Sequence, residues 1–183
     1  NGFFLKKGGL EICRKDDDAR WEELKRKVES GKAFGTNVRL ISASEAKEKF
    51  PLLDEDSIRG AMWDPDAGLV TPRSQDVVNF AVESAKEKGA LSTYTDTPAI
   101  GFEIENERIT GVKTDRGTIK TDKVVIASGI WGPLMGDMAG VRIPLMPVEH
   151  PLLFFGPLPE IQGTEELLVY PLLRDQGNSA YVR

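Results

Sequence analysis

The sequence has little of what disulfide frameworks, zinc sites and cysteine-dependent enzymes require. It contains one cysteine, Cys13, and one histidine, His150, in 183 residues. A single cysteine excludes an internal disulfide and a cysteine-based zinc site. Cys13 lies in the apolar-flanked run Leu-Glu-Ile-Cys, so we interpret it as a strand residue rather than a nucleophile. No metal site is therefore expected.

Excess positive charge and long apolar runs are also lacking. The formal net charge is −5, and no run of lysine and arginine interleaves with aromatic residues, so a nucleic-acid partner is not expected. No stretch reaches the roughly 20 apolar residues of a membrane-spanning helix. Because no basic segment followed by an apolar one opens the chain, we predict a cytoplasmic protein, or a mitochondrial matrix protein if the source is eukaryotic.

The G-x-G-x-x-G turn, which holds a dinucleotide pyrophosphate at a helix N-terminus, does not occur in the sequence. The chain begins at Asn1 rather than Met, inside an apparent strand, and stops inside another, 180–183. We therefore expect an internal piece of a longer polypeptide, large enough for one domain or parts of two.

The first 70 residues predict strands and two capped helices. Residues 2–14 are interpreted as a hairpin whose strands flank a Gly-Gly turn. Asp16–Asp18 supply N-cap oxygens for a helix that ends near Gly35. The run 42–45, Ser-Ala-Ser-Glu, matches a capping box. Strand and turn chemistry follows over 58–71.

Alternation and turn residues organise the middle of the chain. Thr71 is predicted to cap a helix that has Pro72 in its first turn and ends at Gly89. A short strand is predicted at 91–95. Three alternating runs over 100–120, separated by Asn-Glu and Asp-Arg, predict a three-stranded meander.

A continuous apolar run, Val124–Ala127, is typical of a strand buried on both faces in a parallel sheet. A small-residue turn follows it, and then a short helix is predicted within 130–140. Further strands are predicted at 152–155 and 167–170. This order is that of the far half of a nucleotide-binding α/β unit, inserted into an antiparallel layer.

Several phrases of the sequence carry a family resemblance and keep their order over nearly the whole chain. They are 64–72 (DPDAGLVTP), 88–90 (KGA), 111–117 (GVKTDRG), 124–131 (VVIASGIW), 8–10 (GGL), 50–53 (FPLL), 147–150 (PVEH) and 171–175 (PLLRD). The first four resemble the D-amino-acid-oxidase-like superfamily of FAD-dependent oxidoreductases. The last four are most similar to its sarcosine and dimethylglycine dehydrogenase branch.

The resemblance implies FAD as cofactor and an α/β (α+β mixed) fold. Residues 71–140 would form a partial FAD-binding unit with the meander, and 1–70 and 141–183 a mostly antiparallel substrate-domain sheet flanked by helices. The implied reaction oxidises a secondary or tertiary amine of an amino acid by hydride transfer to the flavin. The iminium product would hydrolyse or pass to folate bound by a downstream domain. Because the phosphate-binding turn is missing, we expect this piece alone to be inactive and not to retain FAD.

The resemblance also implies residues that contact the cofactor. Ala127, Ser128 and Gly129 match a small-residue turn beside the flavin, where backbone approaches a planar ligand closely. The alternative is a turn that lets the strand pack against the following helix. Pro98 falls where the family contacts the adenine, or else marks a bend before the meander. Trp131 is a candidate wall of the flavin pocket, with core packing as its alternative.

His150, Tyr170 and Arg174 are the candidate substrate-side residues. An imidazole titrates near neutrality and suits proton transfer from an ammonium group, so His150 is the candidate catalytic residue. Its alternative is a strand histidine with a structural hydrogen bond. Tyr170 and Arg174 are candidate contacts for the amine or carboxylate, because a guanidinium can bind a carboxylate through two parallel bonds. The branch continues His-Gln-Tyr where this sequence has His150-Pro-Leu.

Two other functions are compatible with the sequence. One is a flavoenzyme with a different substrate, similar to glycine oxidase or glycerol-3-phosphate dehydrogenase. The other is a non-catalytic α/β binding domain, which the missing phosphate-binding turn favours. The visible spectrum of the purified full-length protein separates a flavoenzyme, which would be yellow, from a non-catalytic binding domain, which would be colourless.

Overall fold

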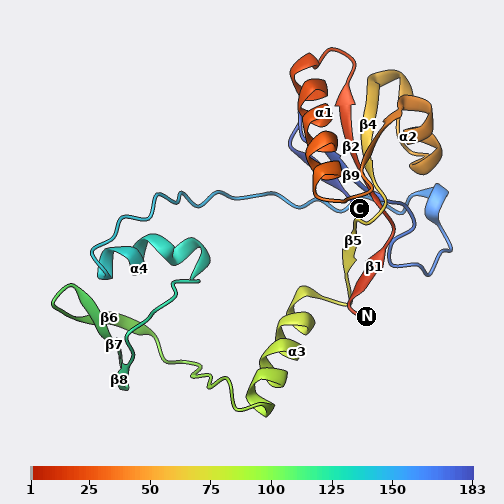
Figure 1. Ribbon diagram of the computed structural model, residues 1–183. Helices are drawn as coiled ribbons and strands as arrows, with labels where there is room; N and C mark the ends of the chain where they lie inside the picture. Colours follow the sequence, from red (N-terminus) through yellow and green to blue (C-terminus); the bar gives the residue numbers. More distant parts are fainter. Residues whose placement is uncertain (1) are drawn as a thin grey trace. The chain divides into compact units, whose positions relative to one another are not determined.

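The computed structural model describes residues 2–183 and divides them into two compact units (Figure 1). The first unit comprises the residues up to Glu87 together with Gly156–Arg183, and the second comprises Lys88–Phe155. No helix within residues 2–183 is long and apolar enough to cross a membrane. The mixed α/β fold class with mostly antiparallel sheets is confirmed.

A five-stranded sheet forms the centre of the first unit, with strand order β10-β9-β2-β4-β3. Its strands are β2 (Gly9–Arg14), β3 (Arg39–Ser42), β4 (Ile58–Asp64), β9 (Leu172–Asp175) and β10 (Ala180–Val182). Three of the four neighbouring pairs are antiparallel, and β2 and β9 are parallel. The sheet therefore joins the beginning of the chain to its last residues.

The predicted hairpin within residues 2–14 is wrong. β1 (Phe4–Lys6) pairs with β5 (Gly68–Val70), while β2 pairs with β4 and β9. Gly8 has φ +83°, and a Cβ on it would lie 2.0 Å from the Trp63 ring. Its backbone N–H donates to the Ala67 carbonyl at 2.8 Å. Gly8 and Gly9 therefore bend the chain between β1 and β2, so that β1 pairs with β5 and β2 with β4. They do not form a hairpin turn.

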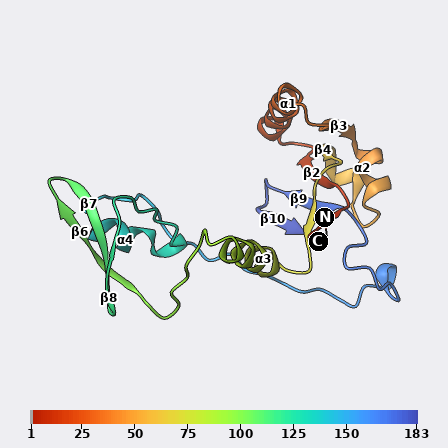
Figure 2. The same cartoon turned by 60° about the horizontal axis from the view of Figure 1, so that its bottom comes forward.

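Helices cover opposite faces of this sheet (Figure 2). On one face, α1 (Asp18–Ala33) buries Leu24 and Val28. α2 (Ala43–Lys49) packs on the other face over the main apolar core. That core consists of Leu10, Ile12, Ile41, Ala46, Phe50, Leu53, Ile58, Ala61 and Leu173. Strand alternation explains the division, because Leu10 and Ile12 point to one face and Glu11 and Cys13 to the other.

Both helix caps agree with the sequence prediction. The Asp17 side chain accepts a hydrogen bond from the Arg20 N–H at 2.9 Å. The Ser42 hydroxyl accepts from the Glu45 N–H at 3.1 Å, and the Glu45 carboxylate accepts from the Ser42 N–H at 3.1 Å. α1 ends before Gly35, which has φ +76°. Local side-chain chemistry therefore sets where these helices start and stop.

Removing the second cap tests this conclusion. Ser42→Ala is expected to lower the free energy of unfolding by about 1 kcal/mol, because a free N–H at the start of α2 loses its acceptor. Urea denaturation of the purified protein measures the loss. Ser30→Ala, an exposed position inside α1, is the control and should leave stability unchanged or slightly raised. Equal losses in both variants would contradict the capping role.

The third helix starts later than its sequence predicts. α3 (Ser74–Glu87) begins three residues after Thr71, so the prediction of a Thr71 cap and a first-turn Pro72 is wrong. The Thr71 N–H instead donates to the Phe3 carbonyl at 3.0 Å, which extends the β1–β5 pairing. Thr71 therefore continues the hydrogen bonding of β5 with the start of the chain instead of capping α3.

The second unit contains the predicted meander. β6 (Ala99–Glu105), β7 (Arg108–Thr114) and β8 (Gly117–Lys120) pair antiparallel in sequence order. Asn106 and Glu107 have φ of 49° and 62°, as a tight two-residue turn requires. A short 3-10 helix, Gly129–Trp131, then leads into α4 (Gly132–Met138), which agrees with the short helix predicted there.

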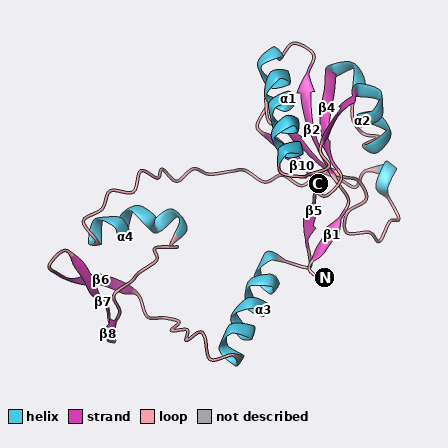
Figure 3. Cartoon of the chain, viewed as in Figure 1, coloured by secondary structure: helices cyan, strands magenta, loops and turns pink. Residues whose placement is uncertain are grey.

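Four predicted strands are wrong: 91–95, Val124–Ala127, 152–155 and 167–170 all lie outside strands (Figure 3). A strand needs a neighbour for its backbone hydrogen bonds, and no segment within residues 2–183 pairs with them. Val125, expected to be buried on both faces, is 88% exposed. An apolar run alone cannot specify which chain segment will lie beside it.

Candidate functional site

The small-residue turn of the second unit leaves open space at its backbone. Gly129 has φ +56°, and a Cβ added to it would meet no atom within 4 Å. The Ser128 hydroxyl is buried and has no hydrogen-bond partner within residues 2–183. Trp131, two residues on, is 62% exposed. This turn combines an unsatisfied polar atom with room for a close backbone approach.

The remaining candidates of the second unit lie apart from its regular elements. Pro98 is exposed and immediately precedes β6. Ala127 is exposed in the segment before the 3-10 helix. His150 is exposed and lies in the irregular segment that follows α4, not on a strand. These positions are accessible to a ligand, and packing within this unit does not fix their side chains.

The first unit has a pocket of about 220 Å³ on the α1 face of its sheet. Its lining comprises Gly9, Leu10, Glu11, Met62, Asp64, Ala67, Leu172, Arg174 and Tyr181. Arg174 lies on β9 with its guanidinium 5.5 Å from the centre of the Tyr181 ring on β10. The pocket thus includes one of the predicted substrate-side residues. It also includes three polar residues that the sequence did not single out.

Tyr170 lines a different pocket from Arg174. Its ring packs against Phe50 at 5.4 Å between ring centres, at the edge of the main core. Phe50 and Tyr170 line a cavity of about 350 Å³ together with residues of the 158–169 segment. The structure therefore does not bring Tyr170 and Arg174 into one pocket.

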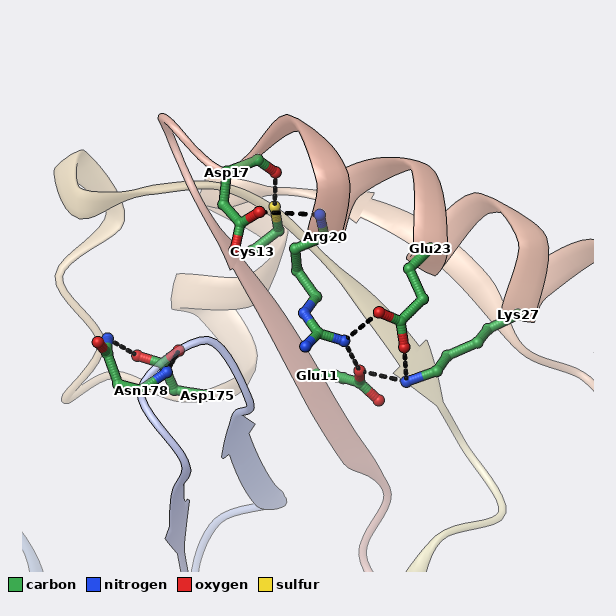
Figure 4. Close-up of polar contacts among 8 residues, drawn as sticks. All are labelled: Glu11, Cys13, Asp17, Arg20, Glu23, Lys27, Asp175 and Asn178. Atoms are coloured by element: carbon green, nitrogen blue, oxygen red, sulfur yellow. Dashed lines mark hydrogen bonds and ion pairs between the residues drawn. The ribbon is translucent and has the colours of Figure 1, made fainter.

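Glu11 is a buried carboxylate beneath α1 (Figure 4). Its Oε1 accepts a hydrogen bond from Lys27 Nζ at 2.6 Å and lies 3.6 Å from Arg20 Nη1. Glu23 pairs with the same two cations, with Lys27 Nζ at 3.0 Å and with Arg20 Nη1 at 2.6 Å. The hydrogen bond from Lys27 holds the pKa of Glu23 below its usual value. The charge of Glu11 is therefore neutralised within the protein.

A second buried carboxylate, Asp175, fixes the turn between β9 and β10. Its Oδ2 accepts hydrogen bonds from Arg14 Nε at 3.0 Å, Arg14 Nη2 at 2.7 Å and Asn178 Nδ2 at 2.8 Å. Its Oδ1 accepts from the Asn178 N–H at 3.3 Å. Burial raises the pKa of Asp175, but the hydrogen bonds from Asn178 and Arg14 outweigh it and lower the pKa overall. Figure 4 shows the Asn178 contact.

Comparison with known proteins decides the family. The family model described as FAD dependent oxidoreductase matches residues 2–183. The chain belongs to this family. Sarcosine dehydrogenase from Homo sapiens is 29% identical over 98% of the chain, and dimethylglycine dehydrogenase from Rattus norvegicus is 28% identical over 90%. The chain spans 19% of the length of each of these curated relatives.

A solved structure agrees with this assignment. The crystal structure of L-proline dehydrogenase from P. horikoshii is 34% identical, with a TM-score of 0.74. The match covers 98% of this chain and 46% of that one. The resemblance seen in the sequence to FAD-dependent oxidoreductases of the sarcosine and dimethylglycine dehydrogenase type is thereby confirmed.

The residues of this FAD-dependent oxidoreductase chain fit part of a flavin site. A flavin presents a flat ring edge that hydrogen-bonds to backbone and hydroxyl groups, which requires side chains that do not obstruct it. Ser128 supplies a buried hydroxyl without a partner among residues 2–183, and Gly129 supplies the open space. Gly136 differs, because a Cβ there would lie 2.5 Å from the Val141 carbonyl oxygen, so internal packing explains that glycine.

Proposed function

We propose that the protein oxidises a secondary or tertiary amine of an amino acid by hydride transfer to FAD. The family match over residues 2–183 carries the proposal. The names of its relatives support the substrate class, because sarcosine, dimethylglycine and L-proline are all N-substituted amines that carry a carboxylate. The bound flavin supplies the electron acceptor.

The small-residue turn is proposed to lie against the flavin. In this role Ala127, Ser128 and Gly129 offer backbone and one hydroxyl at the ring edge, and Trp131 flanks the pocket. Pro98 has no N–H, so its contact with the adenine is proposed to use its carbonyl. The same assignment places the cofactor half at 71–140 and the substrate half at 1–70 and 141–183.

His150 is proposed to accept the proton that an ammonium substrate must lose before oxidation. An amine can release a hydride from its neighbouring carbon only when its nitrogen lone pair is free. The imidazole of His150 is exposed, and imidazole is the side chain most often used as a general base. Tyr170 and Arg174 are proposed to contact the substrate.

A flavin measurement tests the proposal. The full-length protein that carries this chain is expected to be yellow and to lose its visible flavin band when sarcosine, dimethylglycine or L-proline is added without oxygen. The isolated 183-residue chain is expected to be nearly colourless. A full-length protein with no flavin in its acid extract would instead support a non-catalytic binding domain. Bleaching by glycine or glycerol 3-phosphate alone would favour the other flavoenzymes.

A glycine substitution tests the turn itself. In the full-length protein, Gly129→Ala is expected to weaken flavin retention about tenfold, equivalent to about 1.4 kcal/mol, because a methyl group would enter the space left for the ring. Gly89→Ala is the matched control, since Gly89 also has positive φ and an open Cβ direction. Flavin content after dialysis measures both variants. If both lose flavin equally, backbone strain rather than contact explains the effect.

A further inference from the structure

We propose that two cations of α1 hold the buried Glu11 carboxylate away from Arg174 and so keep the Arg174 guanidinium free for the carboxylate of the substrate. The two cations are Lys27 and Arg20. They are positioning residues, because they act through Glu11 and not by contact with the substrate. This inference rests on the proposed function, in which Arg174 contacts the substrate, and it names the side chains that keep this contact available.

Glu11 of β2 and Arg174 of β9 are neighbours on one face of the sheet. They are partners in the parallel β2–β9 pairing. Paired residues of adjacent strands point to the same face, and adjacent strands lie about 4.8 Å apart. Both side chains also line the same pocket. A glutamate and an arginine in this arrangement can reach each other, and an ion pair between them would occupy the group that a substrate carboxylate needs.

The Glu11 carboxylate bonds to α1 instead (Figure 4). Its Oε1 accepts a hydrogen bond from Lys27 Nζ at 2.6 Å and lies 3.6 Å from Arg20 Nη1. Arg174 forms no ion pair within residues 2–183, and its guanidinium lies 5.5 Å from the centre of the Tyr181 ring. The Glu11 side chain is only 8% exposed, so a cation rather than water must balance its charge. The α1 cations therefore satisfy a charge that would otherwise pair with Arg174.

The spacing of residues along α1 brings the two cations over Glu11. Arg20, Glu23 and Lys27 follow one another at intervals of three and four residues and so share one side of the helix. Glu23 pairs with Arg20 at 2.6 Å and with Lys27 at 3.0 Å, which holds both cations in place. Together with Glu11 these side chains carry two positive and two negative charges. Loss of one cation leaves the cluster with a net charge of −1 beside Arg174.

Kinetics of the full-length flavoprotein test the inference. Lys27→Met keeps an unbranched side chain that favours helices, but it removes the charge. The variant is expected to raise KM about five- to tenfold for whichever of sarcosine, dimethylglycine and L-proline is turned over fastest, because Glu11 then pairs with Arg174. The kcat should change less than about threefold, since a binding contact is weakened and the reacting groups are untouched.

Removal of the Glu11 charge gives the second readout. The double variant Lys27→Met/Glu11→Gln has no carboxylate to pair with Arg174, so its KM should return to within about twofold of that of Glu11→Gln alone. If Lys27 served only to hold α1 on the sheet, the loss of a second contact of the same network would not restore KM. In an Arg174→Gln background, Lys27→Met should leave KM unchanged.

Lys25→Met is the matched control. Lys25 lies on the same helix, pairs with Glu22 at 2.6 Å and is 46% exposed, outside the Glu11 network. Its KM should match that of the unchanged protein. An active protein in which Lys27→Met does not alter KM, or in which Glu11→Gln does not restore it, would overturn the inference. An unchanged full-length protein without flavin or turnover would overturn the proposed function itself.

Discussion

Leu24→Ala is expected to lower the free energy of unfolding of the first unit by about 3 kcal/mol. Leu24 is 0% exposed and, with Val28, anchors α1 to the sheet. Truncation removes the apolar contacts and leaves a cavity that the rigid helix–sheet contact cannot close. α1 also carries both cations that neutralise Glu11, so the loss of packing loosens that network too.

Urea unfolding followed by tryptophan fluorescence measures this loss. Trp21 lies on α1, and its ring would be 3.1 Å from a Cβ on Gly60 of β4, so its emission reports separation of the helix from the sheet. Leu167→Ala is the control, because Leu167 is 63% exposed. That variant should lose less than about 1 kcal/mol. Comparable losses in the two variants would show that α1 is not anchored through Leu24.

Asp175→Asn is expected to destabilise the protein by about 2 kcal/mol at pH 7. The substitution keeps the shape of the side chain but removes the charge that accepts two hydrogen bonds from Arg14. The Arg14 side chain is 41% exposed, and water therefore solvates its charge in the variant, which limits the loss of stability. Asp18→Asn is the control, because Asp18 pairs with Arg59 while 91% exposed and should change stability by less than about 0.5 kcal/mol.

The stabilising effect of the Asp175 carboxylate is expected to depend on pH. The pKa of Asp175 is lower in the folded protein than in the unfolded chain, where it is near 3.9. The carboxylate therefore adds stability above about pH 4, and that contribution is lost as the pH falls through the folded pKa. The stability gap between the unchanged protein and Asp175→Asn should be constant from about pH 5 to 7 and should narrow below about pH 4. A constant gap down to pH 3 would contradict this linkage.

Features set by neighbouring residues were predictable from the sequence. The caps of α1 and α2 and the three-stranded meander depend on contacts a few residues apart, and all are confirmed. Pairings between distant segments were not predictable. The bend at Gly8 has the composition of a hairpin turn. Its contacts with the Trp63 ring and the Ala67 carbonyl, both distant in the sequence, show that it is not one.

In the candidate site, too, one residue could be found from the sequence and others could not. Arg174 was found through a family phrase, whereas Glu11 gave only a faint signal, one acidic residue between apolar neighbours on a strand. Its partners Arg20 and Lys27 lie on a separate element, and their approach depends on how α1 packs. Asp64 and Tyr181 reach one pocket only because β2 lies between β4 and β9.

The parallel pairing of β2 with β9 affects how the protein is made. β2, β4 and β3 are complete once residue 64 has been synthesised, but β9 begins only at Leu172. During the intervening synthesis, β2 is an open sheet edge with unpaired backbone groups, including those of Gly9–Glu11. A nascent chain in this state can recruit a foreign strand, and folding is slowed by the long loop that must close. Chaperone demand during translation should therefore fall sharply once β9 emerges from the ribosome.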